Sequence, residues 1–376
     1  MTMLGSGALE HYRTMNNLNP LTQTMTEELI NPDIRLARTL PSNFYFDERL
    51  FESSRRLFNN WQYALHISEF KKENIVPLTH IEEITGEPLF IVKDNSSCLS
   101  NVCTHRGMRL VEKPCSKTTL QCPYHGRTFD ISGQMKHMPE FEQAIGFPSE
   151  EDNLKQHPLH IWKGLYFTSL SHVEKLPWSL VESRLDFLEI ESFVHDASRD
   201  RDHHIMANWM LYVDNYLEGF HIPFVHPELN QALDYSGYTT ELFEGGVLQI
   251  GKAASGDVKF DFPKGHPDYG QDIAAYYLWM FPNMMFNFYP WGMSLNIVIP
   301  VSSTETRVIY RGYVRDEDLA KAGAGSILDT VEIQDQEIIE SVQKSMKSQS
   351  YDRGRYSPTR EQGVHHFHRM ISKRLD

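Results

Sequence analysis

Two short segments, each carrying one cysteine and one histidine, constrain this sequence more than any other feature. The first reads CTHRGMRL and contains Cys103 and His105, and the second reads CPYHGRTF and contains Cys122 and His125. Together they form the spacing C-x-H-x16-C-x2-H. If each segment is the tip of a hairpin, the four side chains can surround one compact metal centre, because thiolates favour zinc or iron–sulfur centres and imidazole suits either. The sequence therefore predicts a metal centre built from these four residues.

Zinc and an iron–sulfur cluster are the two candidates for this centre. A structural zinc site usually pairs cysteine with cysteine and histidine with histidine at the two ends of a module. A Rieske [2Fe-2S] cluster has two cysteines on one iron and two histidines on the other. A mixed pair in each segment gives each iron one ligand from each hairpin. We therefore expect a Rieske cluster, with Gly107 and Gly126 letting the backbone approach the sulfurs.

The remaining composition narrows the class of protein. The chain has 376 residues and four cysteines, too few for a disulfide scaffold, so we interpret Cys98 and Cys115 as core thiols. A formal net charge of -14 argues against nucleic acid as a partner. The chain shows no signal peptide and no run of about 18 apolar residues. We therefore expect no membrane association and a cytoplasmic location.

Hydrophobic spacing and turn residues divide the chain into four predicted segments. Residues 1–40 are polar and are interpreted as an N-terminal arm, and residues 41–60 hold a helix, predicted between Phe46 and Trp61. Residues 61–175 alternate short β-favouring runs with Gly and Pro, which is typical of a small all-β domain. Residues 176–376 are mixed, with helical spacing at 209–224, strands within 247–314 and helical propensity from 326 to 375.

A second group of potential ligands lies in residues 214–228, which read DNYLEGFHIPFVHPE. His221 and His226 are five positions apart, so an intact helix would place them about 140° apart, on different faces. Pro223 breaks the helical hydrogen-bond ladder, and a widened or ended turn would let both rings face one metal. Glu218 lies three residues before His221 and could orient its ring. Alone, such a pair is more often packing, but the predicted Rieske domain upstream favours a metal site.

The third ligand of this second centre is not selected by the local sequence. A non-heme iron that activates oxygen typically binds two histidines and one carboxylate and leaves other positions open. Residues 214–228 supply the histidine pair. The candidate carboxylates are Asp335, Asp329, Glu332 and Glu337 in the predicted C-terminal helix, and the nearby Asp214.

The two motifs, in this order, resemble the α subunits of Rieske non-heme iron aromatic-ring-hydroxylating oxygenases over residues 40–376. The resemblance implies an α+β fold, with a small all-β Rieske domain inserted beside a helix-grip catalytic domain of antiparallel sheet and long C-terminal helix. It implies Asp335, in the segment EIQDQEIIESVQ, as the third ligand of a mononuclear Fe(II). It also implies that Glu218 joins this iron site to His125 of the next subunit in a homotrimer.

Some residues of this chain resemble one branch of that family, and others depart from the family pattern. Glu218, where many members have Asp, and the run NFYPWGMSLNI resemble the branch of choline monooxygenase and carnitine oxygenase, which act on quaternary ammonium compounds. Two residues depart from the family pattern, since Arg127 stands where Trp is usual and Met210 where Lys is common. The departures concern cluster potential and packing, not the class.

The resemblance implies the terminal oxygenase of a Rieske system, a mono- or dioxygenase that uses O2 to hydroxylate or oxidatively demethylate a small molecule. We expect a quaternary ammonium substrate, because aromatic faces bind such cations. The predicted pocket residues are Tyr235, Phe243, Phe288 and Trp291, and Tyr238, Phe286 and Tyr289 are also available. No Gly-rich nucleotide fingerprint follows a strand, so electrons should come from a separate NAD(P)H-dependent reductase or ferredoxin.

Three other functions remain open at this point. An aromatic-lined pocket would equally suit a planar aromatic substrate. A Rieske electron-transfer protein without catalysis would need only the small domain, and a binding protein would hold a ligand in the second half without chemistry. The iron content and the effect of replacing His221 distinguish these alternatives from an oxygenase.

Overall fold

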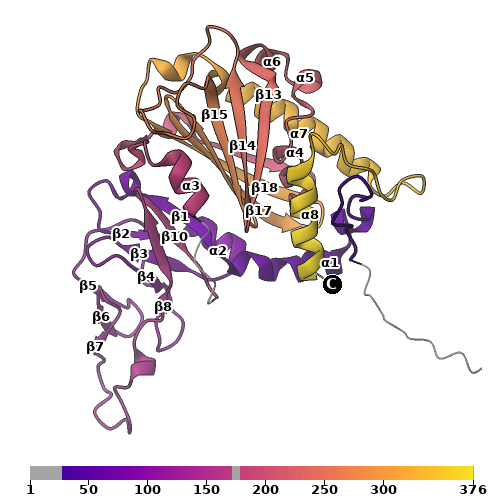
Figure 1. Cartoon of the computed structure of the whole chain (residues 1–376). Coiled ribbons are helices and arrows are strands. Elements are labelled where there is room, and N and C mark those ends of the chain that lie inside the picture. The colour runs from indigo at the N-terminus through magenta and orange to yellow at the C-terminus, as the bar shows by residue number, and fades with distance from the viewer. Residues whose placement is uncertain (1–27, 172–177, 376) are drawn as a thin grey trace, which may run out of the picture.

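The computed structural model describes residues 28–171 and 178–375, and Figure 1 shows their arrangement. Most of the predicted N-terminal arm, residues 1–27, lies outside the described residues. The remainder of that segment packs on the catalytic half, where Ile30, Ala37 and Leu40 are buried. Arg38 also forms an isolated β-bridge with Arg355. Residues 28–40 are therefore part of the folded core.

Three small antiparallel sheets make up most of the N-terminal half. The first has the order β1 (Gln62–His66), β10 (Leu165–Thr168), β9 (Leu159–Trp162). The second has the order β2 (Ile75–Pro77), β3 (Leu89–Val92), β4 (Ser97–Ser100), β8 (Gln156–His157). The third has the order β5 (Thr119–Gln121), β6 (Thr128–Asp130), β7 (Met135–His137). Within the described residues of the predicted all-β segment, 61–171, the departures are one α-helix, α2 (Thr79–Thr85), which ends at Gly86 in a left-handed conformation, and two short 3₁₀ helices, Ile67–Phe70 and Glu150–Asp152.

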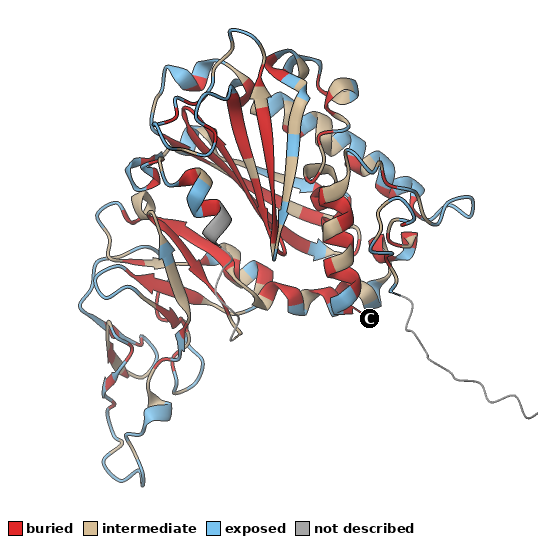
Figure 2. Ribbon diagram, viewed as in Figure 1, coloured by how far each residue is buried: buried red, intermediate tan, exposed pale blue. Residues whose placement is uncertain are grey.

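One eight-stranded antiparallel sheet forms the centre of the C-terminal half. Its order is β11 (Val194–His195), β18 (Glu305–Val314), β17 (Gly292–Ser302), β16 (Met284–Tyr289), β15 (Ile273–Met280), β14 (Gly246–Ala253), β13 (Leu233–Phe243), and β12 (Arg201–Ile205) also pairs with β18. The residues of β15, β16 and β17 are almost all buried, and Figure 2 shows these central strands in red. Because both side-chain directions are buried, both faces of the sheet are covered.

Helices pack against this sheet and against one another. They are α1 (Glu48–Arg55), α3 (Trp178–Leu185), α4 (Trp209–Tyr216), α5 (Ile222–Val225), α6 (Pro227–Ala232), α7 (Leu328–Ser345) and α8 (Gln362–Leu375). Helix α4 contacts α7, α8 and β17, while α6 and α8 contact β13. The expected α+β fold, small β-sheets beside a large antiparallel sheet with C-terminal helices, is confirmed. No helix in the described residues has the length and apolar character needed to cross a membrane.

The observed helices are shorter than the sequence spacing predicts. Helix α1 begins after Asp47, whose side chain accepts hydrogen bonds from two backbone N–H groups, and it tightens into a 3₁₀ turn at Arg56–Asn59. The helix predicted over 209–224 stops at Tyr216 and resumes for one turn at 222–225. The C-terminal helical region is two helices, because the loop between them contains Gly354 and Pro358.

We expect Arg353→Ala to loosen the contact between the N-terminal segment and the loop before α8. The Arg353 guanidinium donates to the carbonyl oxygens of Leu29 at 2.8 Å, Arg38 at 3.2 Å and Thr39 at 2.7 Å. Leaving such acceptors without a donor costs about 1–3 kcal/mol, so Tm should fall by about 2–4 °C. Arg49→Ala removes an exposed arginine on α1 and is the matched control. Equal Tm values for the two variants in calorimetry would contradict this expectation.

Candidate functional site

The two Cys/His segments form loops of the same backbone design. In each loop the cysteine N–H donates to the carbonyl oxygen five residues later, at 2.8 Å for both Cys103 and Cys122. The glycine four residues after the cysteine returns a hydrogen bond to the cysteine carbonyl, from Gly107 at 2.9 Å and from Gly126 at 3.1 Å. Both glycines have positive φ, +73° and +78°, which residues with a Cβ rarely adopt. Each loop therefore presents its cysteine and histidine in the same way.

The side chains of the two loops meet at their tips. The Cys103 and Cys122 thiols are buried and form no disulfide, and burial and the neighbouring Cys122 both raise the pKa of Cys103. The rings of His105 and His125 lie 4.7 Å apart between centroids, at 74° to each other. The Nδ1 atom of each ring is buried and has no hydrogen-bond partner. Buried nitrogens of this kind are costly unless something binds them, so two thiols and two free imidazole nitrogens fit a cluster with mixed sulfur and nitrogen ligands.

Arg127, one of the two departures from the family pattern, joins the two loops. Its side chain is 2% exposed, and Nη1 donates to Thr104 Oγ1 in the other loop at 2.7 Å and to Asp152 at 3.2 Å. The guanidinium lies over the rings of Phe141 and Phe147, at 5.7 and 5.3 Å from their centroids. The arginine thus fills a space between aromatic rings while its charge is paired.

The other two cysteines lie away from these tips. Cys98 is buried in β4, where the Thr168 hydroxyl donates to its sulfur at 3.3 Å, and burial raises the pKa of its thiol to about 12. Cys115 is half-buried and forms a β-bridge with Ile75. Both placements agree with the prediction of core thiols.

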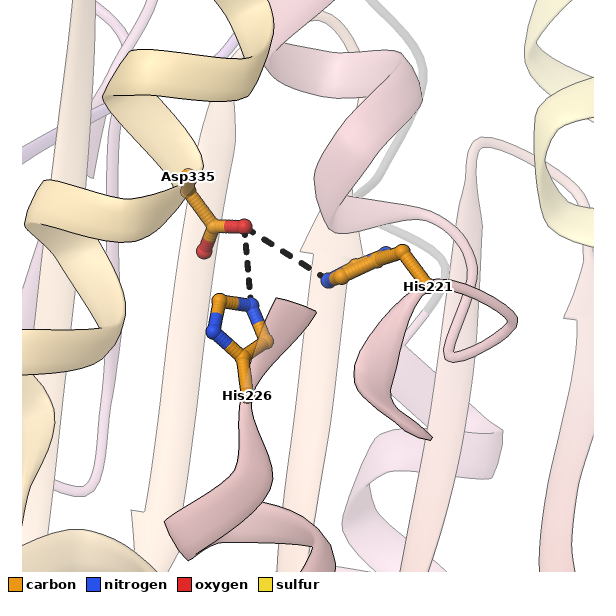
Figure 3. Close-up of side chains that lie close together, drawn as sticks. All are labelled: His221, His226 and Asp335. Atoms are coloured by element: carbon orange, nitrogen blue, oxygen red, sulfur yellow. Dashed lines mark hydrogen bonds and ion pairs between the residues drawn. The ribbon is translucent and has the colours of Figure 1, made fainter. Parts of the chain in front are cut away.

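The second constellation gathers at the break between α4 and α5. His221 immediately precedes the single turn of α5, and His226 ends it. Figure 3 shows both imidazoles directed at Asp335 of α7. Asp335 Oδ1 lies 3.0 Å from His226 Nε2 and 3.5 Å from His221 Nε2. One ligand atom of each residue lies within 4.8 Å of the other two, which is the geometry of a two-histidine, one-carboxylate metal site.

Each histidine is oriented by an outer partner. Glu218 accepts the His221 backbone N–H at 3.0 Å and lies 2.6 Å from Nδ1 of that ring. Burial lowers the pKa of His221, but the hydrogen bond and charge of Glu218 and the charge of Asp335 together raise it more, so the net shift is upward. Gln334 Oε1 lies 2.7 Å from His226 Nδ1. In both rings Nδ1 is engaged outward and Nε2 is left to face the centre. Gln334 was not predicted, since only its adjacency to Asp335 marks it in the sequence.

The five carboxylates that the sequence left open have different surroundings. Asp335 alone among them belongs to the histidine cluster within the described chain. Asp329 pairs with an arginine at 2.5 Å, and Asp214 accepts hydrogen bonds in a separate network with Tyr45 and His368. Glu337 is exposed, and Glu332 faces a cavity.

A cavity of about 100 Å³ opens beside the three donors. Five tyrosines dominate its wall, and neither lysine nor arginine is among its lining residues in the described chain. Burial raises the pKa of the tyrosine hydroxyls, so they stay neutral. The lining residues are Tyr212, Asn215, Tyr216, Glu218, His221, Ile222, His226, Leu229, Tyr238, Tyr277, Asn287, Tyr289, Asn296, Ala324, Leu328, Val331, Glu332 and Asp335.

The cavity wall differs from the aromatic set expected from the sequence. Tyr238 and Tyr289 line it, but Phe288 belongs to the hydrophobic core, because alternate residues of β16 face opposite sides of the sheet. The two tyrosines of α4, Tyr212 and Tyr216, were missed. Their spacing of four residues on a helix was the available signal.

The other three expected aromatics also lie outside this cavity. Trp291 stacks on Tyr289, with 5.4 Å between ring centroids, and lines a neighbouring cavity. Tyr235 lies beneath the guanidinium of Arg360 at 4.0 Å, and Phe243 packs at the edge of the core. These positions depend on the register of β13 and on a turn after β16, which the sequence does not reveal.

Both halves of the chain match models of known protein families. A family model described as the Rieske [2Fe-2S] domain matches residues 60–158, and one described as the ring hydroxylating alpha subunit (catalytic domain) matches residues 190–376. The carnitine monooxygenase oxygenase subunit of Escherichia coli is 29% identical, covering 96% of this chain and 99% of the relative. The chloroplastic choline monooxygenase of Arabidopsis thaliana is 27% identical, covering 95% and 88%.

Solved structures share the fold. A quaternary ammonium Rieske monooxygenase in complex with its substrate L-carnitine has a TM-score of 0.71 and 24% identity, with 92% of this chain and 97% of that chain covered. Naphthalene 1,2-dioxygenase from Rhodococcus sp., bound to indole, has a TM-score of 0.66 and 18% identity, with coverage of 89% and 93%. At these identities the likeness concerns the fold alone.

We expect Gln334→Ala to weaken metal binding at the histidine cluster without unfolding α7. Loss of the 2.7 Å contact removes the group that sets the tautomer and orientation of His226, and such losses typically cost about 10- to 100-fold in metal affinity. Gln336→Ala is the matched control, because Gln336 bonds to His204 and Glu340. Iron retained after dialysis against a graded chelator measures the effect. Equal retention by the two variants would contradict it.

Proposed function

This chain belongs to the Rieske oxygenase α subunits, and from that membership we propose that its substrate is a small quaternary ammonium compound. The chain is the terminal oxygenase of a Rieske system, an oxidoreductase whose cofactors are a [2Fe-2S] cluster and a mononuclear iron. An oxygenase subunit of this kind receives its electrons from a separate reductase. Beyond the family, the cofactors and the reductase, we propose the substrate, the role of each residue and the assembly.

We assign the cluster to the two matching loops. Cys103 and Cys122, whose buried thiols are neighbours, would hold one iron, and His105 and His125 would hold the other through their buried Nδ1 atoms. Gly107 and Gly126 belong to turns that keep the loop backbones close to the cysteines. The unpartnered Nδ1 atoms support this assignment, since the rings otherwise leave two buried nitrogens unsatisfied.

The mononuclear Fe(II) is assigned to His221, His226 and Asp335, whose ligand atoms converge. When bound, the two centres supply single electrons and oxygen activation respectively. The protein contributes the rest. Glu218 and Gln334 hold the two rings in place, and the tyrosine wall orients the substrate and excludes water beside the donors.

The observation that carries the substrate proposal is the wall of the cavity. Tyr216, Tyr238, Tyr277 and Tyr289 present neutral aromatic rings beside the metal donors, and a quaternary ammonium group gains about 1–2 kcal/mol per ring from such contacts. An aromatic acid would bring a net negative charge into a cavity without lysine or arginine in its described lining, where desolvation would disfavour it, whereas the ammonium group of a betaine balances its own carboxylate. The related carnitine and choline monooxygenases support the same class.

We expect oxygen uptake and product formation with carnitine, γ-butyrobetaine, choline or glycine betaine when the purified protein is supplied with a compatible NAD(P)H-dependent reductase or ferredoxin. His221→Ala should abolish product while the visible spectrum of the Rieske cluster survives, because the two centres have separate ligands. Oxygen uptake with aromatic compounds only would overturn the quaternary ammonium proposal. Product formation that persists in His221→Ala would overturn the assigned iron site.

The assembly is proposed to be a homotrimer in which electrons pass between subunits. Figure 1 shows β5–β7, which flank the second Cys/His loop, at the far end of the molecule from α5 and α7. Electron transfer falls off steeply with separation, so the Rieske loops of another subunit would have to approach the iron site. Glu218 supports this path, since it contacts His221 and, together with that residue, also lines a second cavity. His125 of the next subunit would be its partner.

We expect Glu218→Gln to keep both metal centres but to slow electron passage between subunits, because the charged link to the histidine is lost. The single-turnover rate of the reduced protein should fall by at least about tenfold. Glu228→Gln removes a charge from an exposed residue of α6 and is the control. An unchanged single-turnover rate, with the metal content also unchanged, would remove Glu218 from the path.

A further inference from the structure

Glu332 is a buried carboxyl whose role the metal site does not explain. It lies on α7, one helical turn before Asp335, and is 9% exposed. Its side chain forms no hydrogen bond or ion pair with the described residues. It nevertheless lines the cavity beside the three metal donors whose wall contains five tyrosines, called the tyrosine cavity below. A buried carboxyl without a partner is unfavourable in its charged form, and burial holds the pKa of Glu332 well above its usual range. Such a group is stabilised either by binding a proton or by a cation placed beside it.

The surroundings of Glu332 favour a cation from the cavity. Asp329 and Asp335, on the same helix, are close enough to raise its pKa further. Two basic groups, Arg199 and Arg201, line a neighbouring cavity that Glu332 also lines. Arg201 is already paired with Asp329 at 2.5 Å. Arg201 therefore offsets only part of the upward shift in the pKa of Glu332. Among the described residues, no arginine lines the tyrosine cavity.

The charges of the cavity wall lead to the same conclusion. Glu218, Asp335 and Glu332 are its carboxylates, and no described lysine or arginine faces them there. A divalent metal ion held by His221, His226 and Asp335 would balance two negative charges and leave one. A single positive charge placed beside the tyrosines would balance the third.

We propose that Glu332 is the counter-ion of the substrate's quaternary ammonium group and thereby selects cationic over neutral substrates. The proposal rests on the quaternary ammonium function above and assigns its charge selectivity to one residue. The tyrosine faces contribute to binding any compact apolar group, whereas Glu332 distinguishes a trimethylammonium group from a tert-butyl group of the same shape.

The test compares ligand pairs of equal shape. Carnitine, γ-butyrobetaine and choline are each paired with the uncharged isostere in which a tert-butyl group replaces the trimethylammonium group. Binding to the anaerobic, iron-loaded protein is measured by calorimetry for the wild type, Glu332→Gln, Glu332→Asp and Glu337→Gln. Glu337 is exposed on the same helix, so its variant has the same change of charge without facing the cavity. Because each variant binds both members of a pair, the isostere reports whether its cavity is intact.

In the wild type and Glu337→Gln, the ammonium ligand should bind more tightly than its isostere. Glu332→Gln should reduce that preference by about tenfold or more, and Glu332→Asp should keep most of it. If Glu332→Gln keeps the full preference, Glu332 is not the counter-ion, while the quaternary ammonium function stands. If the wild type prefers the isosteres, or binds none of the ammonium ligands, both proposals fall. If Glu332→Gln binds neither the ammonium ligand nor its isostere, the result with Glu332→Asp decides. A preference for the ammonium ligand that is unchanged in Glu332→Asp supports the proposal, and loss of that preference overturns it.

Discussion

The catalytic half of this protein depends on a helix that stops after Tyr216 and resumes for one turn at Ile222. Had the helix continued, the imidazoles on either side of Pro223 would point in different directions. The interruption turns both rings toward Asp335, and Gly219 permits it, because a Cβ there would lie 2.9 Å from the ring of Tyr238. The same close approach brings that tyrosine into the cavity wall. The metal donors and the tyrosine-lined cavity beside them therefore share one local cause.

The ligands of the two metal centres are brought together by different physical routes. The Rieske loops are local structures, each closed by hydrogen bonds within six residues and by one glycine with positive φ. The mononuclear site joins His226 to Asp335 across 109 positions of sequence, so it forms only after α7 has packed against α4. Outer contacts complete both centres, from Arg127 between the loops and from Gln334 behind a histidine. Ligands drawn from distant segments need such support, because small shifts of either segment would separate them.

The cavity combines aromatic rings with unbalanced negative charge. Tyrosines from α4, β13, β15 and β16 converge on it, since alternate strand residues face the same side of the sheet. Neutral hydroxyls and ring faces would hold a cation without bonding to it, which suits chemistry on a methyl or methylene group beside the nitrogen. A carboxyl such as Glu332 adds a charge preference that rings alone provide only weakly. Selectivity would thus arise from two features. The ring faces contribute to binding any compact apolar group, whereas the contribution of the carboxyl depends on the positive charge of the substrate.

The amino-acid sequence by itself determined the fold class and the histidine pair, and it selected the four Cys/His positions that we assign to the cluster, because these follow from local spacing and from a resemblance carried by short motifs. Spacing could not choose among five carboxylates, nor predict Gln334, since contacts between α7 and the α4–α5 break depend on helix packing. The aromatic wall was only partly anticipated. Residues one position apart on a strand face opposite sides, so Tyr289 lines the cavity while Phe288 enters the core. Tertiary structure alone decided which side each faces, because that depends on strand register, and register is set by partners distant in the chain.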